Sequence, residues 1–411
     1  MKTRRTAVFV VLTFAYLLSQ FLRHANAAIA DSVSHDLSLT AAQLGLMTSL
    51  FYVAFAAAQV PLGIALDRLR PRFVLAGLML ASGIGCVIFA SAQSLATLAA
   101  GRALIGLGMA GVLMGSFKIL GRWYPPQRFA TVSGLLIGLG GLGGLLAASP
   151  LVWFNQNYGW RAAFSTGAAV IAVSAVFVAL VARDWPRGEG PSHTTAAQYT
   201  GSVRTIFSDG RFWRLGPLNF FLNGMLMAFQ GLWAGPFLMD VHHMTPAGKG
   251  AYLSLLSGGV VAGYLTGGWL ADRIGIYRAV MGAGGVFVAT QAVFLLSVLK
   301  LVPWLLGGAY FVFGFAGAFQ ILTVVQIGSL FPASMTGRAV TAVNMMGFAG
   351  TAFLQWIMGV VIGSVGKTDL GGYAPKAYVA ALSIGAAATL LALIWYGAAR
   401  RLRWPHTAAP S

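Results

Sequence analysis

Long apolar runs recur along the entire chain and are separated by short polar segments. Each run has about 20 residues or more, enough to cross a hydrocarbon core about 30 Å thick as an α-helix. Only 9% of the residues are charged, whereas a soluble domain averages about 25%. The pattern predicts an all-α integral membrane protein with spans at residues 7–29, 41–65, 73–92, 97–120, 130–153, 161–182, 213–238, 249–270, 279–299, 303–328, 339–362 and 377–399.

The first apolar run could also be a secretory signal, because basic residues precede it and Ala25-Asn26-Ala27 resembles a cleavage site. Arg23 and His24 interrupt the run just before that site. If the run is kept and the N-terminus is inside, nineteen Lys and Arg residues fall on the cytoplasmic side and five on the other. The positive-inside rule demands this sorting. We therefore expect an uncleaved first span, both termini in the cytoplasm, and a multi-pass protein of the inner membrane.

The net charge of +18 would suggest nucleic acid in a soluble protein, but here the topology accounts for it. The longest polar stretch, residues 183–212, falls between the sixth and seventh spans. We expect it to be a cytoplasmic linker between two six-helix bundles, residues 1–182 and 213–399, followed by a cytoplasmic tail, residues 400–411.

The loops after the second and eighth spans repeat one pattern, Gly-x-x-x-Asp-Arg, at the same place in each half. Its residues are Gly63, Asp67 and Arg68 in the first half, followed by Arg72, and Gly268, Asp272 and Arg273 in the second. Parallel six-span repeats are a known transporter architecture, in which the substrate site lies between the halves near the midplane.

At these loops the sequence resembles the major facilitator superfamily, and the resemblance covers nearly the whole chain. The repeated loop resembles motif A of that family, and Arg102-x-x-x-Gly106 resembles motif B. The Gly-Pro pair of motif C is missing from the glycine-rich fifth span, which argues against a drug antiporter. The resemblance implies twelve helices in two pseudo-symmetric six-helix bundles and transport by alternating access of the rocker-switch kind.

The repeated loops are candidate gates. Gly63 and Gly268 would permit close helix approach, and Asp67 and Asp272 could pair with arginine or meet the positive end of a neighbouring helix. Such a cluster could latch one gate and release it when the halves rock. The alternative is that the arginines are solvated and only fix the topology. The gating residues expected from this pattern are Gly63, Asp67, Arg68, Arg72, Gly268, Asp272 and Arg273.

After this sorting, Arg23, Arg102 and Lys118 are the basic residues left at membrane depth, and none of the nine acidic residues lies within a span interior. Charge buried in a bilayer is costly and usually functional. Because the buried charge has one sign and no counter-ion from the chain, the sequence indicates a small organic anion as the substrate.

Arg23 is the main candidate for binding this anion. It shares one face of the first helix with Tyr16 and Gln20, and its planar guanidinium suits a carboxylate or a phosphate. The alternative is that Arg23 reaches towards the outer interface. Neutral polar residues in the second half could bind the substrate or hold helices together: Asn219, Asn223, Gln230, Gln320, Asn344 and Gln355.

Three further residues at membrane depth have candidate roles. The resemblance to motif B implies that Arg102 bonds to helices of its own half or serves proton coupling. His24 could titrate and take part in coupling, or simply pack. Lys118 could reach the cytoplasmic interface or guide an anion through the inner vestibule.

No span contains a nucleophile with a base or a metal-ligand cluster, so we expect neither an enzyme nor a cofactor or metal site. Three alternatives stay open: efflux of drugs or metabolites on the same fold, copper import near His242-His243-Met244, and a transporter-like solute sensor. The expected partners are a small-molecule substrate, H+ or a counter-anion, and the lipid bilayer. Nucleic acid is not expected, and the protein should be a monomer.

Replacing Asp67 by Asn should abolish transport while leaving expression and folding intact, because the carboxylate would no longer hold its gate. Uptake of a labelled substrate into proteoliposomes measures this. Unchanged uptake would contradict the gating role.

Overall fold

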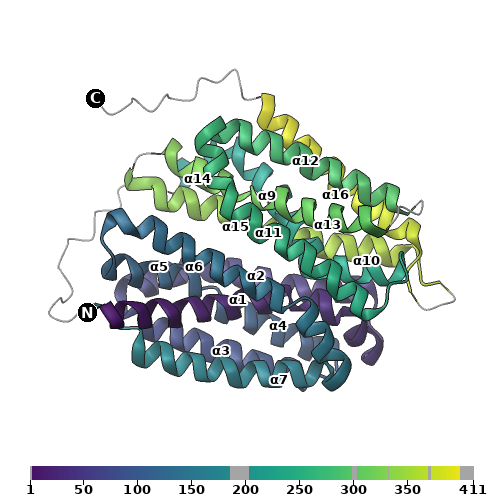
Figure 1. Cartoon of the computed structure of the whole chain (residues 1–411), viewed down its shortest axis with the longest axis horizontal. Coiled ribbons are helices and arrows are strands. Elements are labelled where there is room, and N and C mark those ends of the chain that lie inside the picture. The colour runs from purple at the N-terminus through teal and green to yellow at the C-terminus, as the bar shows by residue number, and fades with distance from the viewer. Residues whose placement is uncertain (1, 186–202, 299–302, 332, 369–371, 399–411) are drawn as a thin grey trace.

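The computed structural model describes residues 2–185, 203–298, 303–331, 333–368 and 372–398, and these are almost entirely helical. Two helical bundles lie side by side, one purple to teal and the other green to yellow in Figure 1. The first comprises α1 (Lys2–Asp36), α2 (Ala41–Arg68), α3 (Pro71–Ala90), α4 (Leu95–Met109), α5 (Val112–Trp123), α6 (Pro126–Leu146) and α7 (Ser149–Val181).

The second bundle follows the short helix α8 (Val203–Phe207). It begins with α9 (Phe212–Ala228), the π-helix η1 (Phe229–Trp233) and α10 (Ala234–Asp240), which together form one broken span. It continues with α11 (Pro246–Ile274), α12 (Ile276–Ser297), α13 (Pro303–Ala318), α14 (Ile321–Leu330), α15 (Ala333–Ser364) and α16 (Pro375–Ala398). Of the expected linker and tail, residues 186–202 and 400–411 lie outside the described residues.

The predicted twelve-span architecture is confirmed. Ten stretches of helix are long and apolar enough to cross a membrane in the described part of the chain. One of them, Thr131–Val181, holds two spans, because Gly159 bends the chain with φ of 81°. The broken span Phe212–Asp240 completes the twelve.

The spans differ from the expected boundaries where helices break. Residues 97–120 were expected as one helix, but α4 and α5 meet at Ala110-Gly111; the equivalent span of the second half breaks between α13 and α14. The fifth span was expected at residues 130–153, yet α6 ends at Leu146 and α7 begins at Ser149. The hydropathy of a run does not record such interruptions, which depend on packing against neighbouring helices.

Local signals explain several helix starts. Thr40 forms a capping box before α2, in which its hydroxyl accepts from the Gln43 backbone N–H and the Gln43 side chain accepts from the Thr40 N–H. Proline occupies the first turn of α3, α6 and α11, where no helical N–H partner is required.

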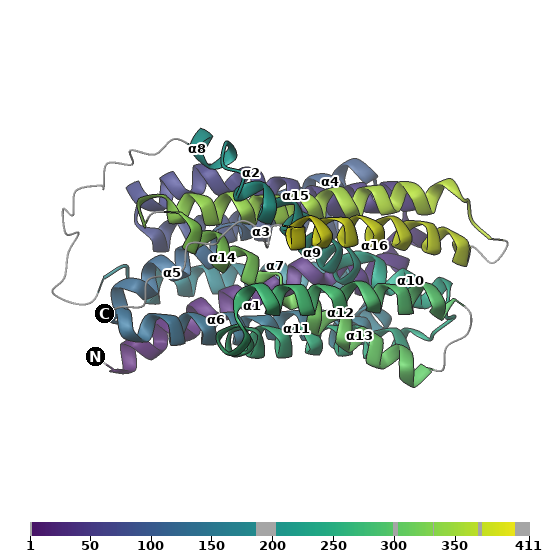
Figure 2. The ribbon, with the colours of Figure 1, turned by 90° about the horizontal axis from the view of Figure 1, so that it is seen from above.

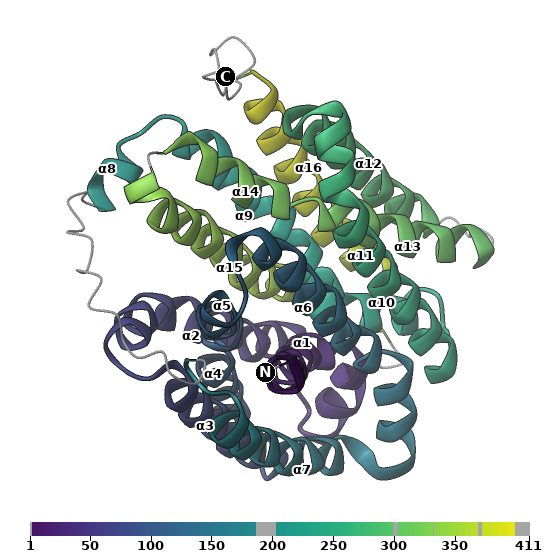
Figure 3. The same cartoon turned by 60° about the vertical axis from the view of Figure 1, so that its left-hand side comes forward.

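An even number of spans brings the start of α1 and the end of α16 to the same side of the bundle, which we call the terminal side; the opposite side is the distal side. Figure 2 shows helices of both halves running along one long axis. Figure 3 shows α1 inside the first half, where it packs mainly against α6 and α7. The two halves meet chiefly through α2 with α15, α1 with η1, and α11 with α6 and α7.

The halves are pressed together on the distal side. A Cβ atom added to Gly235 of α10 would lie 2.0 Å from the carbonyl oxygen of Ala27 on α1, so only glycine fits there. In contrast, a Cβ atom on Gly63 or Gly268, near the terminal ends of α2 and α11, would meet no described atom within 4 Å. Close helix contacts at these two glycines are therefore absent from the described residues in this state, and their role in gating stays a prediction.

Replacing Gly235 by Val should lower the melting temperature of the purified protein. The added atoms cannot fit against Ala27 without moving α10 from α1, and overpacking typically costs about 1–3 kcal/mol. Gly285→Val on α12 is the matched control, since its Cβ would meet open space. Equal melting of the two variants would contradict the close contact.

Candidate functional site

Arg23 lies between the two halves. Its guanidinium carbon is 5.0 Å from the ring centroid of Phe55 on α2 and 5.3 Å from that of Phe348 on α15, so each half supplies one ring. The residue is 8% exposed, and Nε is buried without a hydrogen bond. The described residues show no ion pair for Arg23. Its side chain is thus held between aromatic rings rather than extended towards the outer interface.

Tyr52 and Gln355 add buried polar atoms beside Arg23. Both residues are fully buried, and within the described structure the Tyr52 hydroxyl and both polar side-chain atoms of Gln355 have no hydrogen-bond partner. A Cβ atom on Gly231 would lie 3.2 Å from Nε2 of Gln355, 3.3 Å from the Tyr52 hydroxyl and 3.5 Å from the Arg23 carbonyl oxygen. The π-helix η1 therefore presents its glycine where α1, α2 and α15 converge, a placement typical of functional sites.

A second group of polar residues extends from η1 towards α6 and α11. Nε2 of Gln230 on η1 donates to the hydroxyl of Ser257 on α11 at 3.3 Å, and Ser257 donates to the carbonyl of Gly144 on α6 at 3.2 Å. His24 is close by, because a Cβ atom on Gly144 would lie 3.4 Å from its ring. Buried atoms without a partner in the described structure are Oε1 of Gln230, Nδ1 of His24 and Oε1 of Gln20.

Two tyrosines extend the group. Tyr16 is buried on α1, and Tyr264 on α11 accepts a hydrogen bond from Gln320 at 3.5 Å. Tyr16 packs against α6, where a Cβ atom on Gly140 would lie 2.1 Å from its ring. The structure therefore gathers seven of the sequence-derived site residues around one interface between the halves: Arg23, Tyr16, Gln20, His24, Gln230, Gln320 and Gln355.

Asn219 and Asn223 are occupied in holding helices together. The Asn219 amide donates to the Val343 carbonyl at 2.8 Å, and its oxygen accepts from Thr323 at 3.1 Å. Asn223 donates to the Thr351 hydroxyl at 3.3 Å. These bonds tie α9 to α14 and α15, which favours the helix-packing alternative for both residues. Asn344 is partly buried on α15.

Arg102 on α4 contacts the backbone of α1 next to Arg23. It is fully buried, and its Nη1 donates to the carbonyl oxygen of Leu22 at 3.1 Å. Phe51 and Phe89 face the guanidinium at 5.0 and 5.9 Å. Because Leu22 precedes Arg23 directly, this bond fixes α1 at the position that carries the candidate ligand.

Lys118 lies at the terminal end of the first half. Its ammonium donates to the carbonyl oxygen of Leu66 at 2.5 Å, which satisfies an end group of α2. This contact places Lys118 beside the loop that connects α2 and α3, and not next to Arg23.

The loop between α2 and α3 is tied to the end of α7. The backbone N–H of Arg72 donates to Asp184 at 2.9 Å, and Nε of Arg72 lies 3.6 Å from the same carboxylate, which is 3% exposed. The side chain of Asp67 is outside what the structure describes, and Arg68 is exposed. In the second half Asp272 is exposed and Arg273 stacks on Trp269 at 4.3 Å.

The distal side is closed by a polar cluster that the sequence did not reveal. Lys249 of α11, 4% exposed, forms an ion pair with Asp31 of α1 and donates to the Ala28 carbonyl at 3.2 Å. The Ala41 N–H of α2 donates to the Tyr373 hydroxyl at 2.7 Å, which also joins the halves. Lys249 and Asp31 are 218 residues apart, so only the fold shows that they pair.

Asp240 anchors the second half of this cluster. It accepts from the Tyr378 hydroxyl at 2.6 Å and from the Tyr373 N–H at 3.1 Å. Asp31, Asp240 and Tyr373 line a cavity of about 220 Å³ between the halves, to which Ser34 and His35 also contribute.

Two helical bundles with a polar centre between them, closed on one side, define a membrane transport protein. The model of the Major Facilitator Superfamily matches residues 10–355 and 219–411. The chain therefore belongs to the major facilitator superfamily, and its fold is the twelve-helix fold expected from the sequence.

Among curated relatives, the chain is 31% identical over 142 residues to a nitrate/nitrite transporter of Picosynechococcus, covering 34% of this chain and 26% of that protein. It is 24% identical to a probable hexose phosphate transport protein of Chlamydia trachomatis, covering 86% and 81%. It is 27% identical to a probable sulfoacetate transporter of Cupriavidus necator, covering 45% and 43%. In four of the comparisons with curated relatives, the chain covers between 26% and 65% of the relative's own length.

Solved structures share the fold. A bacterial homologue of the human lysosomal transporter Spinster, in an inward-facing and occupied conformation, superposes with a TM-score of 0.75 at 18% identity and covers 100% of both chains. The nucleoside transporter NupG superposes with a TM-score of 0.77 at 16% identity, covering 97% of this chain and 100% of that one.

Replacing Lys249 by Met should open the distal side, because Asp31 would lose its counter-charge in a poorly solvated contact. A cysteine introduced at Ser34, which lines the distal cavity, should then react several times faster with a maleimide. The only native cysteine, Cys86, is buried and should contribute little background.

Lys376→Met is the matched control, since Lys376 is an exposed lysine of the same side. Exchanging the charges in the double variant Asp31→Lys and Lys249→Asp should restore slow labelling. Fast labelling of the Lys376 control, or slow labelling after Lys249→Met, would refute the closure role.

Proposed function

We propose that this protein carries a small organic anion across the inner membrane by alternating access, as a secondary-active or facilitative transporter. In this proposal the terminal side faces the cytoplasm, because nineteen of the Lys and Arg residues then lie on that side and five on the other. The structure corresponds to a state whose distal side, facing outward, is closed.

The position of Arg23 carries the proposal. A guanidinium remains charged in proteins, and an uncompensated charge at membrane depth is expensive. Phe55 and Phe348 offer this charge only the faces of their rings. A carboxylate, sulfonate, phosphate or nitrate group would supply the missing opposite charge and match the flat, forked donor.

The neighbours of Arg23 would fix the rest of the substrate. Tyr52 and Gln20 come from the first half, and Gln230, Gln355 and the Tyr264–Gln320 pair come from the second. An anion bonded to Arg23 and to these groups would touch both halves, so binding can favour one relative orientation of the halves over another. The relatives named as transporters of nitrate, sulfoacetate and hexose phosphate support an anionic substrate, and the last two of these solutes are organic anions.

The coupling partner is proposed to be H+ or a counter-anion. His24 and Arg102 are the candidate coupling residues, since His24 follows Arg23 on α1 and Arg102 holds the Leu22 carbonyl. Copper import has less support: His242 lies 3.1 Å from the Ser297 hydroxyl, and the described residues contain no group of three His, Cys, Asp or Glu side chains able to hold a metal.

Replacing Arg23 by Gln should weaken the binding of organic anions by about 10- to 100-fold, because a hydrogen bond to a charged group contributes about 1.5–3 kcal/mol. Arg23→Lys keeps the positive charge but loses the forked guanidinium. Its affinity for the anion should therefore lie between those of wild type and Arg23→Gln. A thermal-shift screen of purified wild type with anionic, neutral and cationic metabolites identifies the ligand, and calorimetry then gives its affinity for each variant.

Arg214→Gln is the control, because Arg214 stacks on Trp395 at 4.2 Å, away from the site. The anion proposal fails if only neutral or cationic compounds stabilise the wild type. It also fails if Arg23→Gln binds the identified anion as tightly as Arg214→Gln does.

A further inference from the structure

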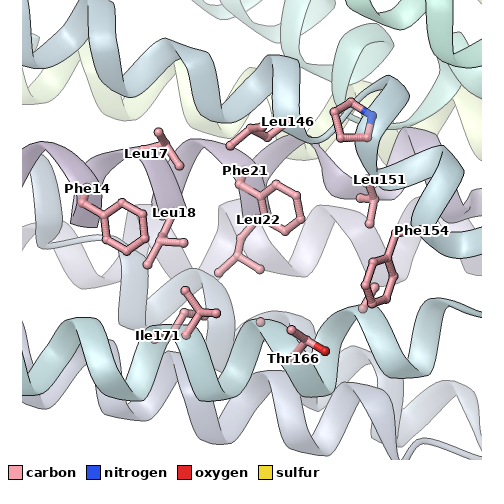
Figure 4. Close-up of a pocket in the computed structure, with 14 residues that line it drawn as sticks. Phe14, Leu17, Leu18, Phe21, Leu22, Leu146, Leu151, Phe154, Thr166 and Ile171 are labelled. Carbon is pink, nitrogen blue, oxygen red and sulfur yellow. The ribbon is translucent and has the colours of Figure 1, made fainter. Parts of the chain in front are cut away.

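An apolar groove runs along the outer surface of the first half between α1 and α7. It consists of two cavities of about 340 and 460 Å³ that share Phe14 and Val170. Figure 4 shows the side chains of the first cavity, with Phe14, Leu18 and Leu22 of α1 facing Thr166 and Ile171 of α7. Thr166 and Ser174 supply the only hydroxyl side chains among the lining residues of the two cavities.

The groove is accessible from the surrounding bilayer and has the length of one leaflet. Phe14 is 44% exposed, and Val173 and Phe177 on the opposite wall are 57% and 53% exposed. On α1 the lining extends from Val10 to Leu22, a rise of about 18 Å. Half of a hydrocarbon core is about 15 Å deep. A lipid chain entering from the terminal side could therefore fill the groove along its whole length.

Two exposed arginines lie at the terminal ends of the two helices that form the groove. Arg4 is exposed and precedes Val11 by seven residues, which places it on the same face of α1. Arg183 is exposed directly after α7 and six residues beyond Phe177, and its backbone carbonyl is held by the Trp123 indole at 2.6 Å. The adjacent carboxylate of Asp184 is buried and paired with Arg72.

We infer that this groove binds an anionic phospholipid, with one acyl chain between α1 and α7 and the phosphate at Arg4 and Arg183. Inside a membrane the acyl chain gains packing contacts rather than hydrophobic burial, because an unfilled groove forfeits dispersion contacts along its walls. The arginines select the headgroup, since each basic residue near an anionic membrane surface contributes about 1 kcal/mol. This binding site is independent of the proposed substrate.

The site has a structural consequence for α1. Leu22 forms part of the groove wall, and its carbonyl accepts the bond from Arg102. The acyl chain therefore supports α1 on the face opposite to the Arg23 side chain, which lies between the two halves.

Native mass spectrometry of the full chain in detergent, supplied with equal amounts of phosphatidylglycerol and phosphatidylcholine of identical acyl chains, tests the site. Wild type should retain phosphatidylglycerol preferentially. Gly167→Phe should lose the retained lipid, because Gly167 lines the cavity and its Cβ would meet no atom within 4 Å, so the ring can occupy the groove without a clash at Cβ. Val170→Phe fills the groove from the same helix, as a second variant should Gly167→Phe fold poorly.

Gly285→Phe on α12 is the matched control and should retain the lipid, since its Cβ also meets open space but lies away from the groove. The double variant Arg4→Gln and Arg183→Gln should still bind lipid but lose selectivity by about fivefold for each arginine. Equal retention of both lipids by wild type, or full retention of phosphatidylglycerol by folded groove-filling variants, would overturn the inference and indicate annular lipid only.

Discussion

The positive charge of Arg23, enclosed between one aromatic ring from each half, is the constraint on which the centre of this protein depends. Charge at this depth has to be stabilised by its surroundings, and the chain supplies Phe55, Phe348 and neutral amides instead of a carboxylate. Arg102 adds a second buried guanidinium. Its Nη1 donates a hydrogen bond to the Leu22 carbonyl oxygen, and this bond holds α1 in place. The first half is thus organised to keep a cation fixed where the halves meet.

The same helix links this charge to the distal closure. Asp31 follows Arg23 by eight residues on α1, a separation of about 12 Å along the helix axis. Lys249 of the second half therefore holds the helix that carries Arg23. Any rocking motion that breaks the Asp31–Lys249 pair must also change how Phe348 and Gln355 of α15 face Arg23. In the proposed mechanism, α1 would therefore couple substrate binding to distal opening as one rigid element.

The sequence was informative where the signal is local or repeated. Hydrophobic length predicted the spans, and the polar stripe of α1 indicated the shared helix face of Arg23 and Gln20, because side-chain spacing on a helix follows from its geometry. It could not reveal that Arg72 pairs with Asp184 or that Tyr52 lies beside Gln355, since these contacts join distant segments. Asn219 was indistinguishable from a ligand until the structure showed its bonds to Val343 and Thr323. The role of Gly63 in a gate stays a prediction, because in this state a Cβ atom there would meet no described atom within 4 Å.

The two halves repeat the same fold, yet the buried arginines that form no ion pair in the described structure, Arg23 and Arg102, both belong to the first half, whereas the buried Lys249 of the second half is paired with Asp31. Arg23, Arg102 and Lys118 all belong to the first half, while the second half contributes neutral groups such as Gln230, Gln355 and Tyr264 to the centre. Charge-assisted hydrogen bonds are roughly twice as strong as neutral ones, so an anion would be held mainly by the first half in every conformation. The weaker, neutral contacts from the second half are then the ones that can form and break as the halves rock. In the proposed transport cycle, such a division would keep the anion bound during the motion and leave the free-energy difference between the two orientations small.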